Sequence, residues 1–596
     1  MGVLRDAWSY RGLIIIILTP LLLLPLPLLI GSKVAECGFT LLVMAVFWVT
    51  EALPIAVTAL IPALFFPLFG ILKSTEVAAT YFKDFHLLLT GVICLATAIE
   101  KWNLHKRIAL RLVVFIGANP GWLMLGFMVS SAFLSMWLSN TSTAAMLMPI
   151  VEAVIQQIIT ADSEVTMRRE RSLTGCSNTD LQLDGEGLGL DISSLQGVVV
   201  WNQRLSYFTF PKNLPHTLKY TPNTSNVPIP GPQGRYHSVK DHMMCKGLSL
   251  CIAYSSTIGG LTTLPGTSTN LIFNEQINQF YPDCHCINFG NWFILCLPIS
   301  IIVLLLSWVW LHWLFLGSDF RSLLSFRRER SEREKSTARI IEQEYNALGP
   351  LSFQETVTLV IFGLMVVLWL ARDPGFMPGW ASLFPQYSGY ATDATVALLL
   401  GLMFFIIPAN KPSSPKYETL ISWAEFQSCM PWEICLLVGG GFALAEGTKV
   451  SGLSVWVGNL LTPLKNLPIW AIITITCVLV TTFTEVASNP ATITIFLPIL
   501  APLAETFHVN PLIILIPTTL CTSFAFLLPV SNPPNAIVYT YGHLNVIDMV
   551  KAGLGVNIIG VLVVLLAMST WGIPLYNLDT YPDWAPIHTT PNTTGL

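Results

Sequence analysis

The stretches "WLSNTSTAAMLMPI" (Trp137–Ile150) and "SNPATITIFLPI" (Ser488–Ile499) place polar side chains in the middle of long apolar regions. They align without a gap from the Ser-Asn pair onward, so that Asn140 matches Asn489. A single serine or threonine in such a region most often hydrogen-bonds a neighbouring helix. Because the pattern recurs in two distant parts of the chain, it indicates instead a repeated polar site inside a membrane.

Composition supports the membrane setting. The 596 residues are 53% hydrophobic and 11% charged, with a mean hydropathy of +0.62, which is too few charges to cover a soluble globule. Residues 13–30 carry no charge and are long enough to cross a bilayer. A cleaved signal peptide is the alternative for that segment, but many apolar spans follow it. The net charge of −4 argues against a nucleic-acid partner.

The hydropathy pattern predicts about eleven transmembrane helices. Lys and Arg gather after the fourth and sixth of them, which places the N-terminus in the cytoplasm by the positive-inside rule. An odd count then puts the C-terminal tail outside a plasma membrane, where the sequon at Asn592 would be glycosylated. The predicted crossings are 13–31, 37–53, 55–72, 86–99, 247–280, 289–317, 353–371, 392–408, 432–448, 511–541 and 552–575.

Two further apolar regions, 121–158 and 466–505, are too long for one crossing and too short for two. We predict that each is a re-entrant helical hairpin with the Ser-Asn pair at its tip. By the count of crossings, the first hairpin enters from inside and the second from outside. The chain therefore consists of two related halves of opposite orientation.

Each hairpin is followed by a span that is interrupted near its middle, at 257–273 and at 524–539, with Asn270 and Asn535 in corresponding places. Unpaired backbone costs several kcal/mol per group in hydrocarbon, so such breaks persist where they line a cavity or a bound ion. Paired interruptions in inverted halves mark the binding site of a transporter at the bilayer midplane.

The predicted fold class is an all-α polytopic membrane protein with two re-entrant hairpins and inverted repeats. The long segment at about 160–244 is rich in Ser, Pro, Gly and Asn and is predicted to be an irregular cytoplasmic loop. The predicted divisions are 1–120 (scaffold helices), 121–317 (first transport repeat), 318–465 (a surface helix, with the charged run Arg327–Lys335, and second-half scaffold helices) and 466–596 (second transport repeat and extracellular tail).

The residue types at the tips and breaks suit particular ligands. Hydroxyls, asparagine amides and unwound carbonyls are oxygen ligands for sodium, while freed amides and helix N-termini suit an anion. No Lys or Arg lies in either tip or either break. A divalent anion would therefore need co-bound cations to offset its charge, which is a physical reason for obligatory symport.

Other function classes fit less well. An anion channel would be expected to show a ring of Lys or Arg along a pore, and none is visible. An intramembrane enzyme would need a nucleophile with a base, or a metal cluster, and His86, His105 and His543 each stand alone in the sequence. The chain is thus predicted not to be an enzyme.

Several other features have two interpretations. The run Gly439-Gly440-Gly441 resembles a phosphate cradle, but close helix packing fits better because no strand precedes it. Cys284 could pair with Cys286 or with Cys37, or all three could be free thiols. Functional and structural roles are both open for four carboxylates in apolar regions, which are Glu51, Glu100, Glu446 and Glu485.

The hairpin motifs, together with "TSFAFLLPVSNPPNAIV" (Thr522–Val538), "EKWNLHKRIAL", "ATDATVALLLGL", "VGGGFALAEG" and "DMVKAGLGVNIIG", resemble the divalent anion:sodium symporter family. Within it the chain is most similar to the vertebrate sodium/sulfate cotransporters of kidney and intestine. The resemblance covers the chain except for the segment at about 160–244.

That resemblance implies a homodimer in which a scaffold holds a moving, elevator-type transport domain, with sodium ions and the anion clamped between the tips and the breaks. By motif, sodium site one would use Ser135, Ser139, Asn140 and the backbone at Gly266, and sodium site two would use Thr484, Ala487, Asn489 and the backbone at Ser531. The anion would touch Ser139, Asn140, Thr141, Thr267, Ser488, Asn489, Asn532 and Pro533.

The chain departs from the dicarboxylate carriers of that family in three places. Pro490 offers neither a hydroxyl nor an amide hydrogen at the second tip. Asn532 stands where those carriers tend to have Thr, and Ser268-Thr269 where they tend to have Gly-Pro. A compact tetrahedral dianion such as sulfate suits the remodelled site, and a dicarboxylate or tricarboxylate such as succinate or citrate is the alternative substrate.

Overall fold

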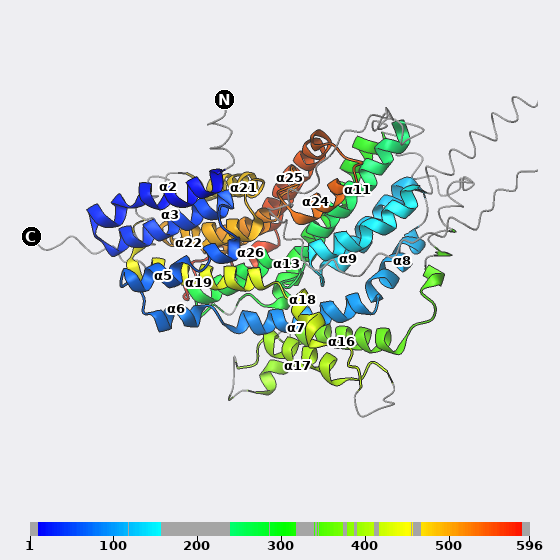
Figure 1. The fold of residues 1–596 in the computed structure, drawn as a ribbon, viewed down its shortest axis with the longest axis horizontal. Helices are drawn as coiled ribbons and strands as arrows, with labels where there is room; N and C mark the ends of the chain where they lie inside the picture. The colour runs from blue at the N-terminus through cyan, green and yellow to red at the C-terminus, as the bar shows by residue number, and fades with distance from the viewer. Residues whose placement is uncertain are drawn as a thin grey trace, which may run out of the picture.

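The computed structural model is built from helices, which Figure 1 shows as one elongated assembly. Among the described residues, extended pairing is limited to an isolated bridge between Pro408 and Thr419, so the predicted all-α class is confirmed. The structure describes residues 10–586 apart from 117–118, 157–238, 285, 318–338, 340–341, 344, 373–377, 385, 387–389, 411–416, 454–455 and 457–466.

The N-terminal helices lie together at one end of the molecule (Figure 1). Ser32 caps one of them, because its hydroxyl oxygen accepts from the amide of Ala35 at 3.2 Å. In chain order these elements are α2 (Arg11–Leu23), η1 (Leu26–Ile30), α3 (Lys33–Thr50), α4 (Ile55–Thr58), α5 (Ile61–Leu68) and α6 (Ser74–Thr80).

A second group of helices runs along one side of the assembly (Figure 1). Its last helix, α19, packs against α3, α4 and α5 of the N-terminal group. Within this group, Arg107 and Glu355 form a buried ion pair with Nε and Oε1 2.9 Å apart. The elements are α7 (Asp84–Lys101), α8 (Leu104–Ile116), α16 (Phe353–Leu370), η5 (Trp380–Leu383), α17 (Asp393–Ile406), α18 (Trp423–Cys429) and α19 (Trp432–Ser451).

The remaining helices follow the two predicted transport repeats. The first repeat contains α9 (Pro120–Ser135), a helix over residues 140–156, α11 (Val239–Gly260), α12 (Ser268–Phe280), α13 (Phe289–Leu311) and η4 (His312–Leu316). The second repeat contains α21 (Ile469–Thr484), α22 (Asn489–Phe507), α23 (Leu512–Thr522), α24 (Pro533–Thr540), α25 (Val546–Ser569) and α26 (Gly572–Tyr576).

The two repeats are packed into each other rather than standing apart. Helix α11 of the first repeat contacts α24 of the second, α12 contacts α22 and α23, and α13 contacts α25. This cross-packing brings the interrupted spans of both repeats into the interior. Both predicted interruptions are present, because α11 and α12 are separated at 261–267 and α23 and α24 at 523–532.

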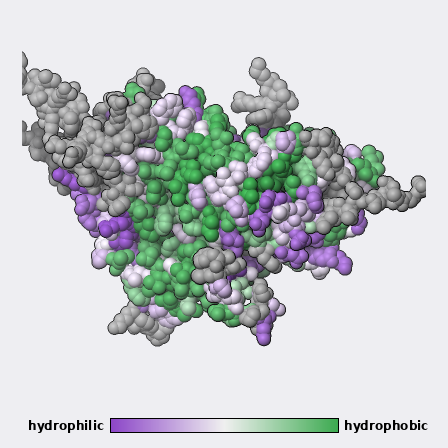
Figure 2. Space-filling model, turned by 180° about the vertical axis from the view of Figure 1, so that it is seen from behind, coloured by the Kyte–Doolittle hydropathy of each residue, from purple (hydrophilic) through white to green (hydrophobic). Residues whose placement is uncertain are grey.

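Length and apolar composition qualify six described helices to cross a membrane, and a seventh if the bent pair of α7 and α8 counts as one. The predicted total of eleven crossings is not confirmed and stays a prediction, because helices such as α17 and α23 are shorter than a full crossing needs. Figure 2 shows a broad apolar surface across the middle of one face, with hydrophilic residues toward its margins. Such a surface fits a chain embedded in lipid.

One predicted boundary is wrong. The irregular loop was expected to reach residue 244, but α11 begins at Val239. Its first turns are polar because they have partners in the second repeat, where Lys246 Nζ lies 2.8 Å from Asp548 Oδ2. The rest of the predicted loop, the predicted surface helix at Arg327–Lys335 and the sequon at Asn592 lie outside the described residues.

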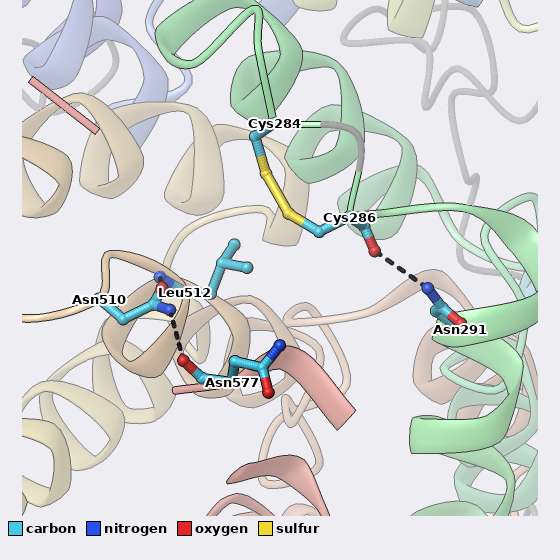
Figure 3. The surroundings of a disulfide bond; sticks show 6 residues. All are labelled: Cys284, Cys286, Asn291, Asn510, Leu512 and Asn577. Carbon is cyan, nitrogen blue, oxygen red and sulfur yellow. Dashed lines mark hydrogen bonds between the residues drawn. A yellow bond between two sulfur atoms is a disulfide. The ribbon is translucent and has the colours of Figure 1, made fainter. Parts of the chain in front are cut away.

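The structure distinguishes between the interpretations of the glycine run and between those of the cysteines. A Cβ atom on Gly440 would overlap the backbone of Ala59, so this run serves close packing of α19. Cys284 is bonded to Cys286, with Cα atoms 5.5 Å apart (Figure 3). Cys37 is a buried free thiol. A cavity of about 320 Å³ beside this disulfide is lined by Asn291, Asn510, Asn577 and neighbouring residues, and none of the predicted site residues lines it.

Candidate sodium and anion site

The first hairpin tip is a short turn between α9 and the helix over 140–156. Ser139 precedes that helix, and its Oγ accepts from the amide of Ser142 at 3.1 Å. The hydroxyl of Ser135 donates to Asn140 Oδ1 at 2.6 Å, which fixes the carboxamide at the tip. Two predicted ligands of sodium site one are therefore in direct contact.

A buried asparagine amide supports the break that faces this tip. The Nδ2 group of Asn270 donates to the carbonyls of Gly260, Leu261 and Thr263 at 3.3, 3.2 and 2.8 Å. Asn270 is fully buried, so without it these carbonyls would have no water to replace the lost bonds. The corresponding asparagines noted in the sequence are thus the supports of the breaks.

The tip and the break of the first repeat touch. Thr263 Oγ1 donates to the Met136 carbonyl at 2.5 Å. A Cβ on Gly260 would overlap the side-chain oxygen of Asn140 and would lie 3.1 Å from the Gly266 carbonyl oxygen. The fold therefore brings Ser135, Asn140 and Gly266 together, and it presents only neutral oxygens there, which is the ligand type that unwound helices offer to sodium.

The second tip repeats this arrangement. Thr484 Oγ1 lies 2.8 Å from Asn489 Oδ1 and 2.8 Å from the Thr522 carbonyl, at the end of α23. Ser488 caps α22, with its Oγ 3.4 Å from the amide of Ala491. The pairs Ser135–Asn140 and Thr484–Asn489 hold equivalent positions in the two repeats.

The second break also has an asparagine support. Asn535 Nδ2 donates to the carbonyls of Ala525 and Leu528 at 2.9 and 3.1 Å, and it lies 3.4 Å from Ser531 Oγ. The Ser531 hydroxyl donates to Leu528 O at 2.8 Å. Ala487 is buried within the tip. Asn535 thus keeps Ser531 in place within the break.

A carboxylate adds to the second break. Glu485 Oε1 accepts from the amide of Phe526 at 2.9 Å and from Asn557 Nδ2 at 2.7 Å, and Oε2 accepts from the amide of Leu527 at 3.1 Å. Glu485 is 6% exposed, so these backbone amides have no water as an alternative partner. Of the two roles left open for this residue, its contacts are those of a structural support.

The predicted anion contacts are placed unevenly. Ser139, Thr141 and Pro533 are exposed, whereas Thr267 and Ser488 are half-buried. Thr267 and Asn532 are the N-caps of α12 and α24, and neither side chain accepts from a backbone amide of its own helix, although the Thr269 hydroxyl donates to Thr267 Oγ1 at 3.4 Å. The N-terminus of α12 therefore retains backbone amides for an anion. Helix α24 begins with Pro533 and Pro534, which have no amide hydrogen, and the amide of Asn535 donates to the Asn532 carbonyl at 3.0 Å.

Sequence reasoning missed some residues that build the site. Gly260 precedes the first break as part of a Gly-Gly pair, which is a readable signal for close approach. Asn557, on α25, gives no such signal, because only the tertiary packing places it beside Glu485. The same holds for Thr257, which accepts a hydrogen bond from Asn532 Nδ2 at 2.9 Å.

Known proteins match the chain along most of its length. The family model described as "Sodium:sulfate symporter transmembrane region" matches residues 5–578. Solute carrier family 13 member 1 of Rattus norvegicus is 57% identical over 98% of this chain and 99% of the relative, and Na(+)/dicarboxylate cotransporter 3 of Mus musculus is 40% identical over 99% and 97%. The solved YdaH transporter of Alcanivorax borkumensis matches 84% of this chain and 89% of its own, at 12% identity and a TM-score of 0.47.

Proposed function

The chain belongs to the sodium:sulfate symporter family, and from this premise we propose that it imports sulfate and similar small divalent oxyanions together with sodium. The protein acts as a secondary transporter in the plasma membrane and not as an enzyme. Its two hairpin tips and two breaks alternate between the two sides of the membrane by an elevator-type movement, within a homodimer.

The observation that carries this proposal is the repeated tip. In both repeats a hydroxyl donates to the side-chain oxygen of a tip asparagine, at 2.6 Å for Ser135–Asn140 and 2.8 Å for Thr484–Asn489. Each pair lies against an interrupted helix. We assign one sodium site to each tip, with the anion between them at the amides of the α12 N-terminus and at Asn532.

Charge explains the coupling. The tips and breaks contain no Lys or Arg, so a dianion placed there needs sodium to offset its charge. Two sodium ions per sulfate would make transport insensitive to voltage, and more than two would make it electrogenic. The sodium ions are cargo as well as counterions.

A sodium-coupled carrier of dicarboxylates or tricarboxylates, such as succinate or citrate, is the second candidate. It is supported by the relatives whose name includes dicarboxylate, which are 40% identical to this chain. Sulfate is favoured because the family model names it and because relatives called Solute carrier family 13 member 1 are 56–57% identical. Pro490 and Asn532 both favour a compact anion. Pro490 removes a possible hydrogen-bond donor at the second tip, and Asn532 places a longer side chain where a threonine would leave room.

Radiolabelled sulfate uptake with sodium or choline outside tests the proposal. We expect uptake that depends on sodium and is inhibited by selenate and thiosulfate, while excess succinate inhibits poorly. In Asn532→Thr, succinate should compete a few-fold better, because a shorter side chain leaves room for a longer anion. Uptake that ignores the sodium gradient would overturn symport, and strong inhibition of the parent by succinate would overturn the choice of sulfate.

The proposed orientation places the C-terminal tail outside the cell. We expect a glycan on Asn592, so that Asn592→Gln removes a glycan-sized shift on a gel. A second sequon, Asn223-Thr224-Ser225, lies in the segment at about 160–244, which is cytoplasmic in this orientation. Asn223→Gln is therefore the matched control and should change nothing. A glycan on Asn223 would contradict the topology.

A further inference from the structure

The two interrupted helices contact each other directly. Tyr254 Oη donates to the Phe526 carbonyl at 3.0 Å, and two further hydrogen bonds between the repeats join polar side chains. Asn532 Nδ2 donates to Thr257 Oγ1 at 2.9 Å, and the hydroxyls of Thr269 and Ser523 lie 2.9 Å apart. We call these four residues the cross-repeat clamp. Each bond joins the start of the second half-helix of one repeat to the end of the first half-helix of the other.

The clamp is dry. Thr257 and Thr269 are fully buried, Ser523 is 1% exposed and Asn532 is 5% exposed. Because water cannot replace a lost partner at such positions, removing a clamp hydroxyl costs a hydrogen bond that solvent does not restore. Thr257 and Thr269 each keep one other contact, to the Ala253 carbonyl at 3.1 Å and to Thr267 Oγ1 at 3.4 Å. The clamp therefore resists separation of the two breaks more strongly than an exposed pair of hydroxyls would.

Its position relates it to the anion. Thr269 lies in the first turn of α12, two residues after the N-cap Thr267, and Asn532 is itself the N-cap of α24. Thr267 and Asn532 are both predicted anion contacts, and the N-terminus of α12 also offers backbone amides. The clamp thus ties each anion-facing N-terminus to the opposite repeat, and so limits how far apart the two can move.

We propose that the cross-repeat clamp determines substrate size, with Thr257, Thr269 and Ser523 acting as positioning residues that do not touch the anion. This inference rests on the proposed function. By holding the two N-termini close, the clamp lets both reach one compact tetrahedral dianion. A dicarboxylate needs two subsites several ångströms apart and is therefore disfavoured.

The test compares Thr269→Val and Ser523→Ala with the parent, in the full chain, for sulfate KM and for inhibition by succinate. Valine keeps the shape of threonine and removes its hydroxyl. We expect sulfate KM to rise and the succinate inhibition constant to fall, changing their ratio by roughly tenfold. Thr269→Ser keeps the hydroxyl and should retain the parent ratio.

Thr262→Val is the matched control. Thr262 is also fully buried in the first break, and its hydroxyl donates at 2.9 Å to Ser300 Oγ of the same repeat. This variant should keep the parent ratio even where its maximal uptake falls. A purely structural role for the clamp predicts lower surface expression and lower maximal uptake in all three variants, with no change of the ratio.

The outcomes separate the two proposals. If the parent shows no sodium-dependent sulfate uptake, the proposed function fails and the clamp fails with it. If the parent takes up sulfate while Thr269→Val and Ser523→Ala keep its ratio, the clamp alone is overturned. An equal change in Thr262→Val would also overturn it, because the effect would then be general loosening of the break. Should one clamp variant fail to reach the surface, the other decides.

Discussion

The two hairpin tips are built alike, but the breaks that face them are held in different ways. In the first repeat Thr263 bonds the carbonyl of Met136, and Asn140 lies against the bare backbone of Gly260. In the second repeat the position of Met136 is occupied by Glu485, whose carboxylate accepts from two backbone amides of the break.

The two breaks differ in which of their backbone groups, carbonyls or amides, are hydrogen-bonded by side chains. The asparagine supports satisfy carbonyls in both breaks, but Glu485 also satisfies the amides of Phe526 and Leu527. A carboxylate accepting from amides is a stronger support than a neutral contact. We infer that the second break is the more rigid of the two, and that the first depends on close packing.

We expect the largest effect from removing the tip asparagine, which both repeats have. Asn140→Ala and Asn489→Ala should each reduce sodium-dependent sulfate uptake on the order of a hundredfold, because the carboxamide is the side chain that organises each tip. Surface labelling should show normal amounts of both variants. Normal uptake at limiting sodium by either variant would mean that its tip holds no sodium, and the equivalence of the repeats would be broken.

The next effect tests the carboxylate that only the second repeat has. Glu485→Gln should lower uptake by roughly tenfold or more, because a glutamine NH₂ group would face the amide donors of the break or of Asn557. Met136→Leu, at the equivalent place in the first repeat, is the control and should stay within about twofold of the parent. Uptake and surface amount are measured together.

Equal effects at Glu485 and Met136 would show that the two breaks are supported in the same way after all. Glu485→Asp sharpens the result, since a shorter carboxylate that restores part of the uptake would attribute the loss to the charge. A failure of Asp to restore any uptake, alongside a normal Gln variant, would assign the role to side-chain length.

The smallest expected effect tests packing in the first repeat. Gly260→Ala should raise the sodium concentration for half-maximal uptake by about fivefold, because the new methyl group would displace Asn140. Ala525, which holds the equivalent place in the second break, already carries a methyl group there. Ala525→Gly is the control and should leave the sodium dependence unchanged within about twofold.

A sodium dependence that shifts equally in Gly260→Ala and Ala525→Gly would contradict the division between a packed break and a carboxylate-held break. The measurement is a sodium titration of initial sulfate uptake at fixed voltage.

Much of the architecture could be predicted from the sequence. The lengths of the apolar segments indicate helices that cross the lipid bilayer. The Ser-Asn motif occurs twice and predicts paired hairpin tips, because polar groups are costly in hydrocarbon unless they serve a binding site. The start of α11 at Val239 could not be predicted, because its polar first turns are stabilised by Asp548, about three hundred positions away in the chain.

The site residues likewise divide into those with local contacts, which the sequence predicts, and those with contacts to distant segments, which it does not. Ser135, Asn140, Thr484 and Asn489 could be identified from the repeated motif, since each hydroxyl lies five residues before its asparagine and the contact is local. The role of Glu485 could not, because a carboxylate in an apolar region is compatible with ligand binding or with support. Its partners lie in the break at 526–527 and on α25 at Asn557, about 40 and 70 positions away in the chain.

The sequence by itself determined that this chain is a helical membrane protein with two related, interrupted repeats, because hydropathy and local motif spacing act over a few turns of helix. The tertiary structure alone decided which breaks face each other, as in the contacts Asn532–Thr257 and Thr269–Ser523. Those contacts join residues about 250 to 275 positions apart, and hydrogen bonds over such separations depend on how whole helices pack.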